Sequence, residues 1–149
     1  MTYLIFGGAG FIGINFVKKI LKSNEKIIIF DKLTKVSNAK EVSAMSDNNE
    51  LIFIQDDICN TAEVYKCLKQ FQPDYIINFA AETHVDTSIE KSFEFIKTNI
   101  LGTHSILESL KKYGYKKNGS NMYFKFLNIS TDEVYGSLEE NEESFVEDS

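Results

Sequence analysis

The sequence predicts an α/β fold, in which a parallel sheet is covered by helices on both faces. Short apolar runs alternate with longer segments of helical periodicity, in the order β-α-β-α-β-α-β-α-β. The apolar runs lack the polar alternation of a half-exposed strand, so the strands are expected to be buried on both faces. We expect the spatial strand order 3-2-1-4-5, with a crevice at the carboxyl ends of strands 1 and 4, where the order reverses.

Each expected element rests on its own apolar pattern. A polar connection is expected from Ala80 to Ile89, and one apolar stripe of the first helix is expected to face the sheet (Phe11, Ile14, Val17, Ile20 and Leu21). The expected strands are Thr2–Phe6, Lys26–Phe30, Leu51–Ile54, Tyr75–Phe79 and Met122–Ile129. The expected helices are Phe11–Ser23, a short helix within Thr34–Asn49, Thr61–Phe71 and a long helix over Ser92–Tyr113.

A glycine-rich turn joins the first strand to the first helix. Gly7 allows the chain to turn sharply, Gly10 allows a pyrophosphate to approach the backbone, and Gly13 allows the helix to pack close to the strand. The N-terminus of the following helix offers free N–H groups and the positive end of its dipole. The alternative is a glycine turn that binds no ligand. The strand–turn–helix context favours a dinucleotide site.

Asp31 strengthens this interpretation. It ends the second apolar run and lies 18 positions after Gly13, where a Rossmann-type doubly wound sheet places the carboxylate that binds the ribose 2′-hydroxyl. Because a carboxylate repels a 2′-phosphate, we expect NAD rather than NADP as the cofactor. Lys32 follows directly and weakens that preference a little.

Polar or small residues follow the remaining strands. We expect Asp57 to accept a hydrogen bond from the adenine amine, and Ala80 and Ala81 to let the cofactor lie against the backbone. Thr131, Asp132 and Glu133 follow the fifth strand. Two adjacent carboxylates beside a hydroxyl can divide acid and base roles if their surroundings separate their pKa values.

Two further polar positions stay open. His84 is better explained as a structural or substrate-contacting residue than as a general base. Thr98 and Asn99 could each reach back to the crevice or cap a local turn.

Composition excludes several classes of function. The chain has 149 residues, of which 43% are hydrophobic, which suits one domain with a real core. Its formal charge is −6 and it contains no Arg, so nucleic acid is not an expected partner. Cys59 and Cys67 form no C-x-x-C pair, which favours reduced thiols and a cytoplasmic protein. No stretch suits a membrane span or a signal peptide.

Six motifs resemble those of the extended short-chain dehydrogenases/reductases that act on nucleotide sugars, and more narrowly those of the dTDP-glucose 4,6-dehydratase family. The Thr-Asp-Glu run is the most specific, because related epimerases and decarboxylases lack this acid pair. The motifs are Gly7–Gly13, Asp31–Thr34, Asp57–Cys59, Ala80–Asp86, Thr98–Thr103 and Ser130–Gly136.

The resemblance implies an internal redox dehydration of dTDP-glucose to dTDP-4-keto-6-deoxyglucose and water. A hydride leaves C4 of the glucose for NAD and later returns to C6. By similarity, Glu133 removes the C5 proton, Asp132 protonates the departing C6 hydroxyl, and Thr131 holds the C4 hydroxyl. Acid and base groups are then within reach of adjacent carbons.

The resemblance also implies binding residues, no metal, and a homodimer formed through the long helix. The implied substrate contacts are Glu82, Thr83, His84 and Thr131. The implied NAD contacts are Gly7, Gly10, Phe11, Ile12, Gly13, Asp31, Lys32, Leu33, Thr34, Asp57, Ile58, Phe79, Ala80, Ala81 and Thr98.

We expect residues 1–137 to form a partial NAD-binding domain and residues 138–149 an acidic tail, with the sheet incomplete at its C-terminal end. The family's Tyr-x-x-x-Lys helix and its substrate domain would follow Ser149, so we expect no turnover by this chain alone. Two alternatives remain open. One is another nucleotide-sugar epimerase or dehydratase, and the other is a non-catalytic nucleotide-binding remnant.

Overall fold

The computed structural model describes residues 1–45, 47–114 and 123–149, and of residues 85–87 it describes the helical backbone alone. Five parallel strands form one sheet in the order β3-β2-β1-β4-β5, which confirms the expected topology. The strands are β1 (Thr2–Phe6), β2 (Lys26–Asp31), β3 (Leu51–Gln55), β4 (Tyr75–Asn78) and β5 (Lys125–Asn128).

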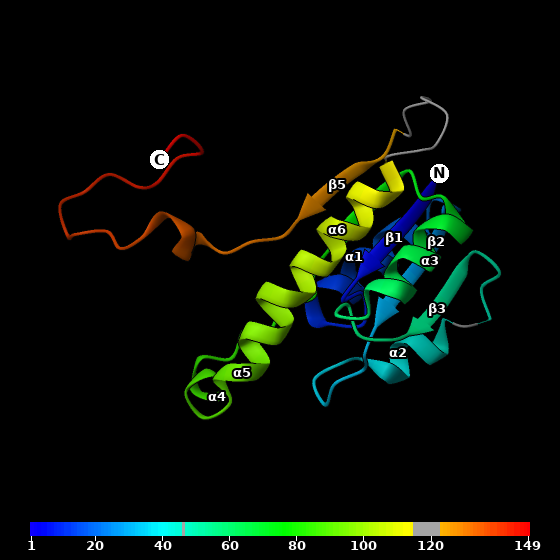
Figure 1. The fold of residues 1–149 in the computed structure, drawn as a ribbon, viewed down its shortest axis with the longest axis horizontal. Coiled ribbons are helices and arrows are strands. Elements are labelled where there is room, and N and C mark those ends of the chain that lie inside the picture. The colour runs from blue at the N-terminus through cyan, green and yellow to red at the C-terminus, as the bar shows by residue number, and fades with distance from the viewer. Residues whose placement is uncertain (46, 115–122) are drawn as a thin grey trace.

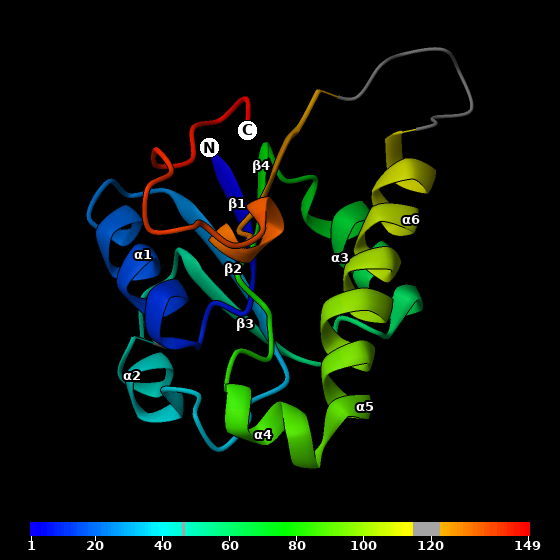
Figure 2. The ribbon, with the colours of Figure 1, turned by 90° about the vertical axis from the view of Figure 1, so that its left-hand side faces the viewer.

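Helices cover the sheet on both faces. Figure 2 shows α1 and α2 on one side of the strands and α3 and α6 on the other. The bounds are α1 (Phe11–Leu21), α2 (Ala39–Ala44), α3 (Thr61–Phe71), α4 (Val85–Glu90), α5 (Ser92–Phe95), the π-helix η1 (Ile96–Gly102), α6 (Thr103–Gly114) and the 3₁₀-helix η2 (Asp132–Tyr135).

The two faces of the sheet build two apolar clusters, because successive residues of a strand point to opposite sides. Leu4 and Phe6 of β1 lie in the cluster beneath α3 and α6, and the Phe6 ring packs edge-on against Phe30 of β2. Ile5 lies in the cluster beneath α1, together with Ile14 and others. The continuous apolar runs are therefore strands buried on both faces, as expected.

Several local expectations were wrong. α1 ends at Leu21 rather than Ser23, and Phe11 is 79% exposed, because it lies to one side of the buried stripe that Gly13, Ile14 and Val17 form on α1. A helix, α4, occupies part of the expected Ala80–Ile89 connection. The long helix contains the π-helical η1. β5 begins at Lys125, and Met122 lies outside the described residues.

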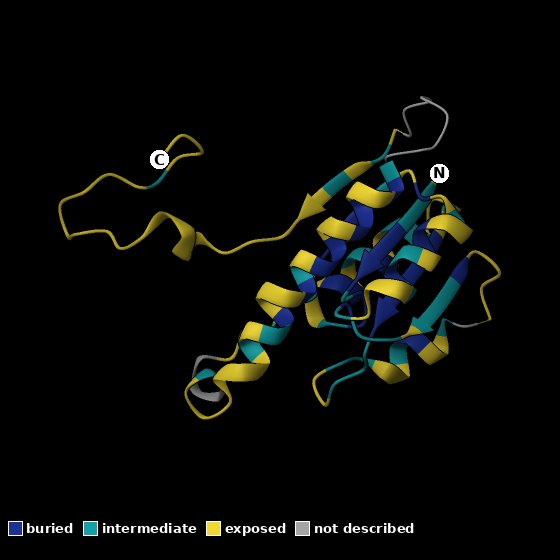
Figure 3. Cartoon of the chain, viewed as in Figure 1, coloured by how far each residue is buried: buried dark blue, intermediate teal, exposed yellow. Residues whose placement is uncertain are grey.

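The segment after β5 leaves the body of the molecule. Figure 1 shows it running away from the sheet, and Figure 3 shows it almost entirely exposed. The Tyr135 ring stacks on Phe145 at 5.3 Å between centroids, which is a contact within the segment itself. Among the described residues, no helix is both long and apolar enough to span a membrane.

Candidate functional site

The turn between β1 and α1 is tightly packed. Gly7 has φ +70°, and a Cβ on it would lie 2.5 Å from the Ala80 nitrogen at the end of β4. A Cβ on Gly13 would lie 2.4 Å from the Gly7 carbonyl oxygen. Both positions therefore require glycine for close packing of backbone on backbone.

Gly10 is different, because it borders open space. A Cβ there would meet only the Gly7 carbonyl oxygen, at 3.2 Å. Gly10 is the N-cap of α1 and offers no side-chain cap. Within the described ranges, no hydrogen bond is recorded from the amides of Phe11, Ile12 and Gly13. These free N–H groups at a helix N-terminus suit an anion such as a pyrophosphate.

The Asp31 carboxylate is tied to this turn. Its Oδ2 accepts the Ala9 N–H at 3.0 Å, and its Oδ1 accepts the Leu33 N–H at 2.8 Å and the Ser37 hydroxyl at 3.3 Å. The residue is only 7% exposed, yet it lines the groove described next. A carboxylate held so firmly presents its remaining lone pairs in a fixed direction, which suits recognition of ribose hydroxyls.

A groove lies at the carboxyl ends of β1, β2 and β4, and Ile58, which follows β3, also lines it. The glycine turn forms its floor, the loop after β2 forms one wall, and the loop after β4 with η1 forms the other. Its lining residues are Gly7, Gly10, Phe30, Asp31, Lys32, Thr34, Val36, Ser37, Ile58, Phe79, Ala80, Ala81, Glu82 and Thr98. The position is the topological switch point, where open α/β sheets bind their ligands.

Lys32 crosses this groove. Its Nζ donates to Glu82 Oε1 and to Thr98 Oγ1, both at 3.1 Å. Lys32 comes from the end of β2, whereas its two partners come from the loop after β4 and from η1. One ammonium group therefore links the two walls.

η1 also fixes the loop after β4. The Asn99 amide pairs with both backbone groups of Glu82: Oδ1 accepts the Glu82 N–H at 2.8 Å, and Nδ2 donates to the Glu82 carbonyl at 2.9 Å. A Cβ on Gly102 would lie 2.4 Å from Ile58 Cδ1. The π-helix η1 thus supports the loop after β4 and packs against Ile58, another lining residue, in keeping with the frequency of π-helical turns at functional sites.

Asp57 lies beside the groove rather than in its lining. Its Oδ1 accepts the Cys59 N–H at 2.9 Å, and Lys97 Nζ lies 3.8 Å from Oδ2. Burial raises the pKa of Asp57, but the Cys59 hydrogen bonds and the charges of Lys32 and Lys97 outweigh it and hold the pKa below its usual value. Burial, together with Asp57, raises the pKa of the Cys59 thiol. Asp57 is thus a fixed anion and Cys59 a neutral thiol.

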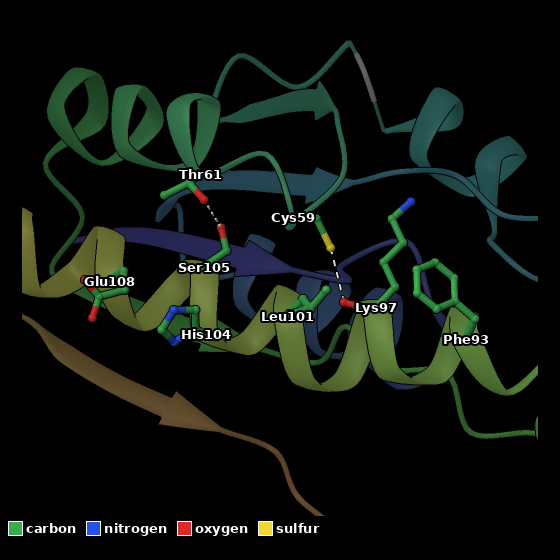
Figure 4. Close-up of a pocket in the computed structure, with 8 residues that line it drawn as sticks. All are labelled: Cys59, Thr61, Phe93, Lys97, Leu101, His104, Ser105 and Glu108. Carbon is green, nitrogen blue, oxygen red and sulfur yellow. Dashed lines mark hydrogen bonds between the residues drawn. The ribbon is translucent and has the colours of Figure 1, made fainter.

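A second hollow lies where the long helix meets the chain at the start of α3. The Thr61 and Ser105 hydroxyls are hydrogen-bonded at 2.8 Å, and the Cys59 thiol donates to the Lys97 carbonyl at 3.2 Å. Figure 4 draws both bonds, which attach the start of α3 and the loop before it to the helix. The hollow is lined by Cys59, Thr61, Phe93, Lys97, Leu101, His104, Ser105 and Glu108.

The structure brings most of the sequence-predicted site residues into the groove, but not all of them. Phe11, Ile12, Gly13, Leu33 and Asp57 adjoin it without lining it. Thr83 and His84 are exposed, and the His84 carbonyl accepts the Ser88 N–H in the first turn of α4.

Thr131, Asp132 and Glu133 are placed outside the groove. All three are exposed, in and just before η2. Among the described residues their side-chain hydrogen bonds are local: Thr131 Oγ1 donates to Asp132 Oδ1 at 3.3 Å and accepts the Glu133 N–H at 3.4 Å. Four strand ends meet at the groove, and the residues after β5 lie apart from it (Figure 1).

Sequence reasoning missed Phe30, Val36 and Ser37 as lining residues, and it left Asn99 open. Phe30 directly precedes Asp31 at the end of the apolar run, and this position could have indicated that Phe30 lines the groove. The contacts of Ser37 and Asn99 had no local signal, because both depend on a loop that turns back on the groove. The described residues hold no cluster of three or more His, Cys, Asp or Glu side chains suited to a metal ion.

Known proteins resemble the chain over nearly its whole length. A family model described as GDP-mannose 4,6 dehydratase matches residues 4–149. The dTDP-glucose 4,6-dehydratase of Salmonella typhimurium is 44% identical over 144 residues, which is 93% of this chain and 39% of that protein.

Solved structures agree with this match. The dTDP-glucose 4,6-dehydratase from Bacillus anthracis in complex with NAD has a TM-score of 0.80 at 38% identity, and the match covers 99% of this chain and 43% of that one. The Streptomyces venezuelae dTDP-glucose 4,6-dehydratase with NAD and TYD bound has a TM-score of 0.82 at 33% identity, covering 95% and 42%. The chain spans about two fifths of the length of these relatives. It belongs to the GDP-mannose 4,6 dehydratase family.

Proposed function

We propose that this chain binds NAD and supplies the nucleotide-binding half of a dTDP-glucose 4,6-dehydratase, with residues 1–137 as the binding domain. The observation that carries the proposal is the groove at the switch point, with free helix N–H groups at one end and a fixed carboxylate beside them. The similarity to dTDP-glucose 4,6-dehydratases, two of them crystallised with NAD, supports the choice of nucleotide and sugar.

The residues present fit the cofactor. Gly10 leaves room for a pyrophosphate above the N-terminus of α1, and Asp31 accepts the ribose hydroxyls. Because the side chains of Ala80 and Ala81 are small, a ring of the cofactor can lie against the backbone after β4. When bound, NAD supplies the acceptor and donor of the hydride.

The sugar chemistry falls to the residues after β5. Glu133 takes the C5 proton, Asp132 gives a proton to the leaving C6 hydroxyl, and Thr131 orients the sugar through its C4 hydroxyl. In this structure the segment lies apart from the groove, so the proposal requires it to fold over the groove, where Glu82, Thr83 and His84 also meet the sugar. Because the chain spans about two fifths of its relatives, we expect it to bind NAD without turning over dTDP-glucose.

We further propose a homodimer formed through the long helix, in the cytoplasm. Five large apolar side chains of α5, η1 and α6 are between 47% and 66% exposed: Phe93, Ile96, Ile100, Leu101 and Leu107. A row of this kind on one helix suits a second copy of the chain. Sedimentation should give a dimer that Ile100→Lys disrupts, and a clean monomer at tens of micromolar would overturn this part. The free thiols Cys59 and Cys67 suit a reducing compartment.

Titration of NADH onto the full chain, followed by nicotinamide fluorescence anisotropy, tests the central proposal. We expect saturable binding that Asp31→Ala weakens, while Glu63→Gln, on α3 and outside the lining of the groove, leaves it unchanged. No saturation at millimolar NADH would overturn the proposal. Product analysis after incubation with dTDP-glucose is the second readout, and conversion by the 149-residue chain would contradict the expected lack of turnover.

A further inference from the structure

The position of the Lys32 ammonium has a consequence for the choice between cofactors. Lys32 is the one cationic side chain among the described residues that line the groove. Its Nζ is held at 3.1 Å by Glu82 Oε1 and at 3.1 Å by Thr98 Oγ1. The Lys32 and Glu82 side chains are 29% and 26% exposed, so the pair is partly shielded from solvent. Its attraction is therefore stronger than that of a fully exposed pair.

The neighbouring Asp31 carboxylate faces other partners. It accepts hydrogen bonds from Ala9, Leu33 and Ser37, and no ion pair joins it to Lys32 in the described part of the chain. Two consecutive residues of opposite charge are thus directed to opposite walls of the groove. The ribose position is left with a carboxylate and without a cation.

A groove that accepts a 2′-phosphorylated ribose needs a cation next to this position. The chain has no Arg, and Lys32, adjacent in sequence to Asp31, is the obvious substitute. Its stem is long and flexible and its ammonium has three donors, so it could turn toward a 2′-phosphate if nothing held it. In this structure Glu82 and Thr98 hold it.

We propose that Glu82 and Thr98 are specificity-determining residues: by holding the Lys32 ammonium across the groove, they withhold it from a 2′-phosphate, and the groove selects NAD over NADP. This inference rests on the proposed NAD binding and goes beyond it, because it assigns the discrimination to an interaction between the two walls in addition to Asp31. The Lys that follows the ribose-binding acid thereby supports the preference for NAD instead of weakening it.

The test measures the dissociation constants of NADH and NADPH on the full chain by nicotinamide anisotropy, and compares their ratio among variants. Glu82→Gln removes the charged partner and should lower the ratio of the NADPH dissociation constant to the NADH dissociation constant by about two- to fivefold, the gain expected for one new, partly exposed ion pair with the phosphate. Thr98→Val removes the second acceptor without changing any charge, and should shift the ratio in the same direction by a smaller factor.

Two further variants separate release of Lys32 from a general change in charge. Glu63→Gln removes the same charge from another Lys–Glu pair, with Lys66 on α3, and should leave the ratio unchanged. In a Lys32→Met background, Glu82→Gln should no longer lower the ratio, because there is no ammonium to release. Such a double-mutant cycle isolates the coupling between the two residues.

Each outcome has one meaning. If the wild-type chain binds neither nucleotide, the proposed function itself fails. If it binds NADH but Glu82→Gln leaves the ratio unchanged, NAD binding stands and the role of the bridge is refuted. If Glu82→Gln lowers the ratio equally in the Lys32→Met background, the effect is one of overall charge and the inference is again refuted. Circular dichroism confirms that each variant is folded.

Discussion

Gly10 and Gly13 lie in the same glycine turn, and replacing each with Ala should separate stability from binding. In Gly13→Ala the new Cβ would lie 2.4 Å from the Gly7 carbonyl oxygen and 2.9 Å from Gly8 Cα. An ordinary C···O contact is about 3.3 Å, so α1 and the turn must move apart by roughly 1 Å. In Gly10→Ala the corresponding contact is 3.2 Å, and the neighbour needs to give by only a fraction of an ångström.

The closeness of each Cβ contact sets the expected change in the free energy of unfolding. Forcing one extra carbon into a packed site costs about 1–3 kcal/mol, and the clash here is with backbone, which favours the upper end. Ala in a helix recovers about 1 kcal/mol relative to Gly. The net loss for Gly13→Ala is about 2 kcal/mol, which lowers the Tm of a chain of this size by about 4–8 °C. Gly10→Ala should cost about 1 kcal/mol or less, the value of an N-cap change.

Binding should follow the opposite order. The methyl group of Gly10→Ala faces the groove and obstructs the pyrophosphate, so charged hydrogen bonds worth about 1.5–3 kcal/mol are lost. NADH should bind about tenfold or more weakly. Thermal melts, urea titrations and NADH anisotropy on both variants make the comparison. A Gly13→Ala chain as stable as the wild type, or a Gly10→Ala chain with unchanged NADH affinity, would refute the reasoning for that glycine.

Three further predictions concern groups around the groove. Gly102→Ala should weaken NADH binding several-fold because its Cβ, 2.4 Å from Ile58 Cδ1, must push a lining side chain into the groove; equal affinity in the variant would count against this. Asn99→Ala removes both hydrogen bonds to the Glu82 backbone and frees an exposed loop, so it should weaken NADH binding while lowering the free energy of unfolding by less than about 1 kcal/mol. A large drop in Tm would instead show that Asn99 has a structural role. Burial raises the pKa of Cys67 to about 12, above the ordinary value of 9.0, so its contribution to stability is complete below pH 9.0 and is lost as the pH rises toward 12. In urea titrations the free energy of unfolding should therefore fall by up to about 1.4 kcal/mol for each pH unit above pH 9.0, and Cys67→Ala should remove this contribution. An equally steep fall in the variant would contradict the assignment.

The sheet could be predicted from the sequence because its signals are local. Buried parallel strands appear as unbroken apolar runs such as Lys26–Phe30, and the order of strands and helices restricts the topology to few choices. The glycine turn and Asp31 could be found for the same reason: close packing and φ > 0 leave few residue types at those positions. The resemblance to dTDP-glucose 4,6-dehydratases also came from short motifs, and the similarity to the Salmonella typhimurium enzyme confirms it.

What only the tertiary structure decided are contacts between distant residues. Lys32 reaches Glu82 and Thr98 across 50 and 66 positions of sequence, and neither periodicity nor composition records such a pairing. The exposure of Phe11 also depends on which stripe of α1 faces the sheet, and that stripe is formed by Gly13, Ile14 and Val17.

The sequence by itself therefore determined the sheet, the strand order and the position of the groove, because each follows from patterns within a few residues. The tertiary structure decided which way each charged side chain in that groove is turned, because hydrogen bonds between separate loops set its direction. It also placed the Thr131–Glu133 run in solvent after β5, where its hydrogen bonds are local. A motif specifies which groups are present, whereas packing of the chain around them determines what they face.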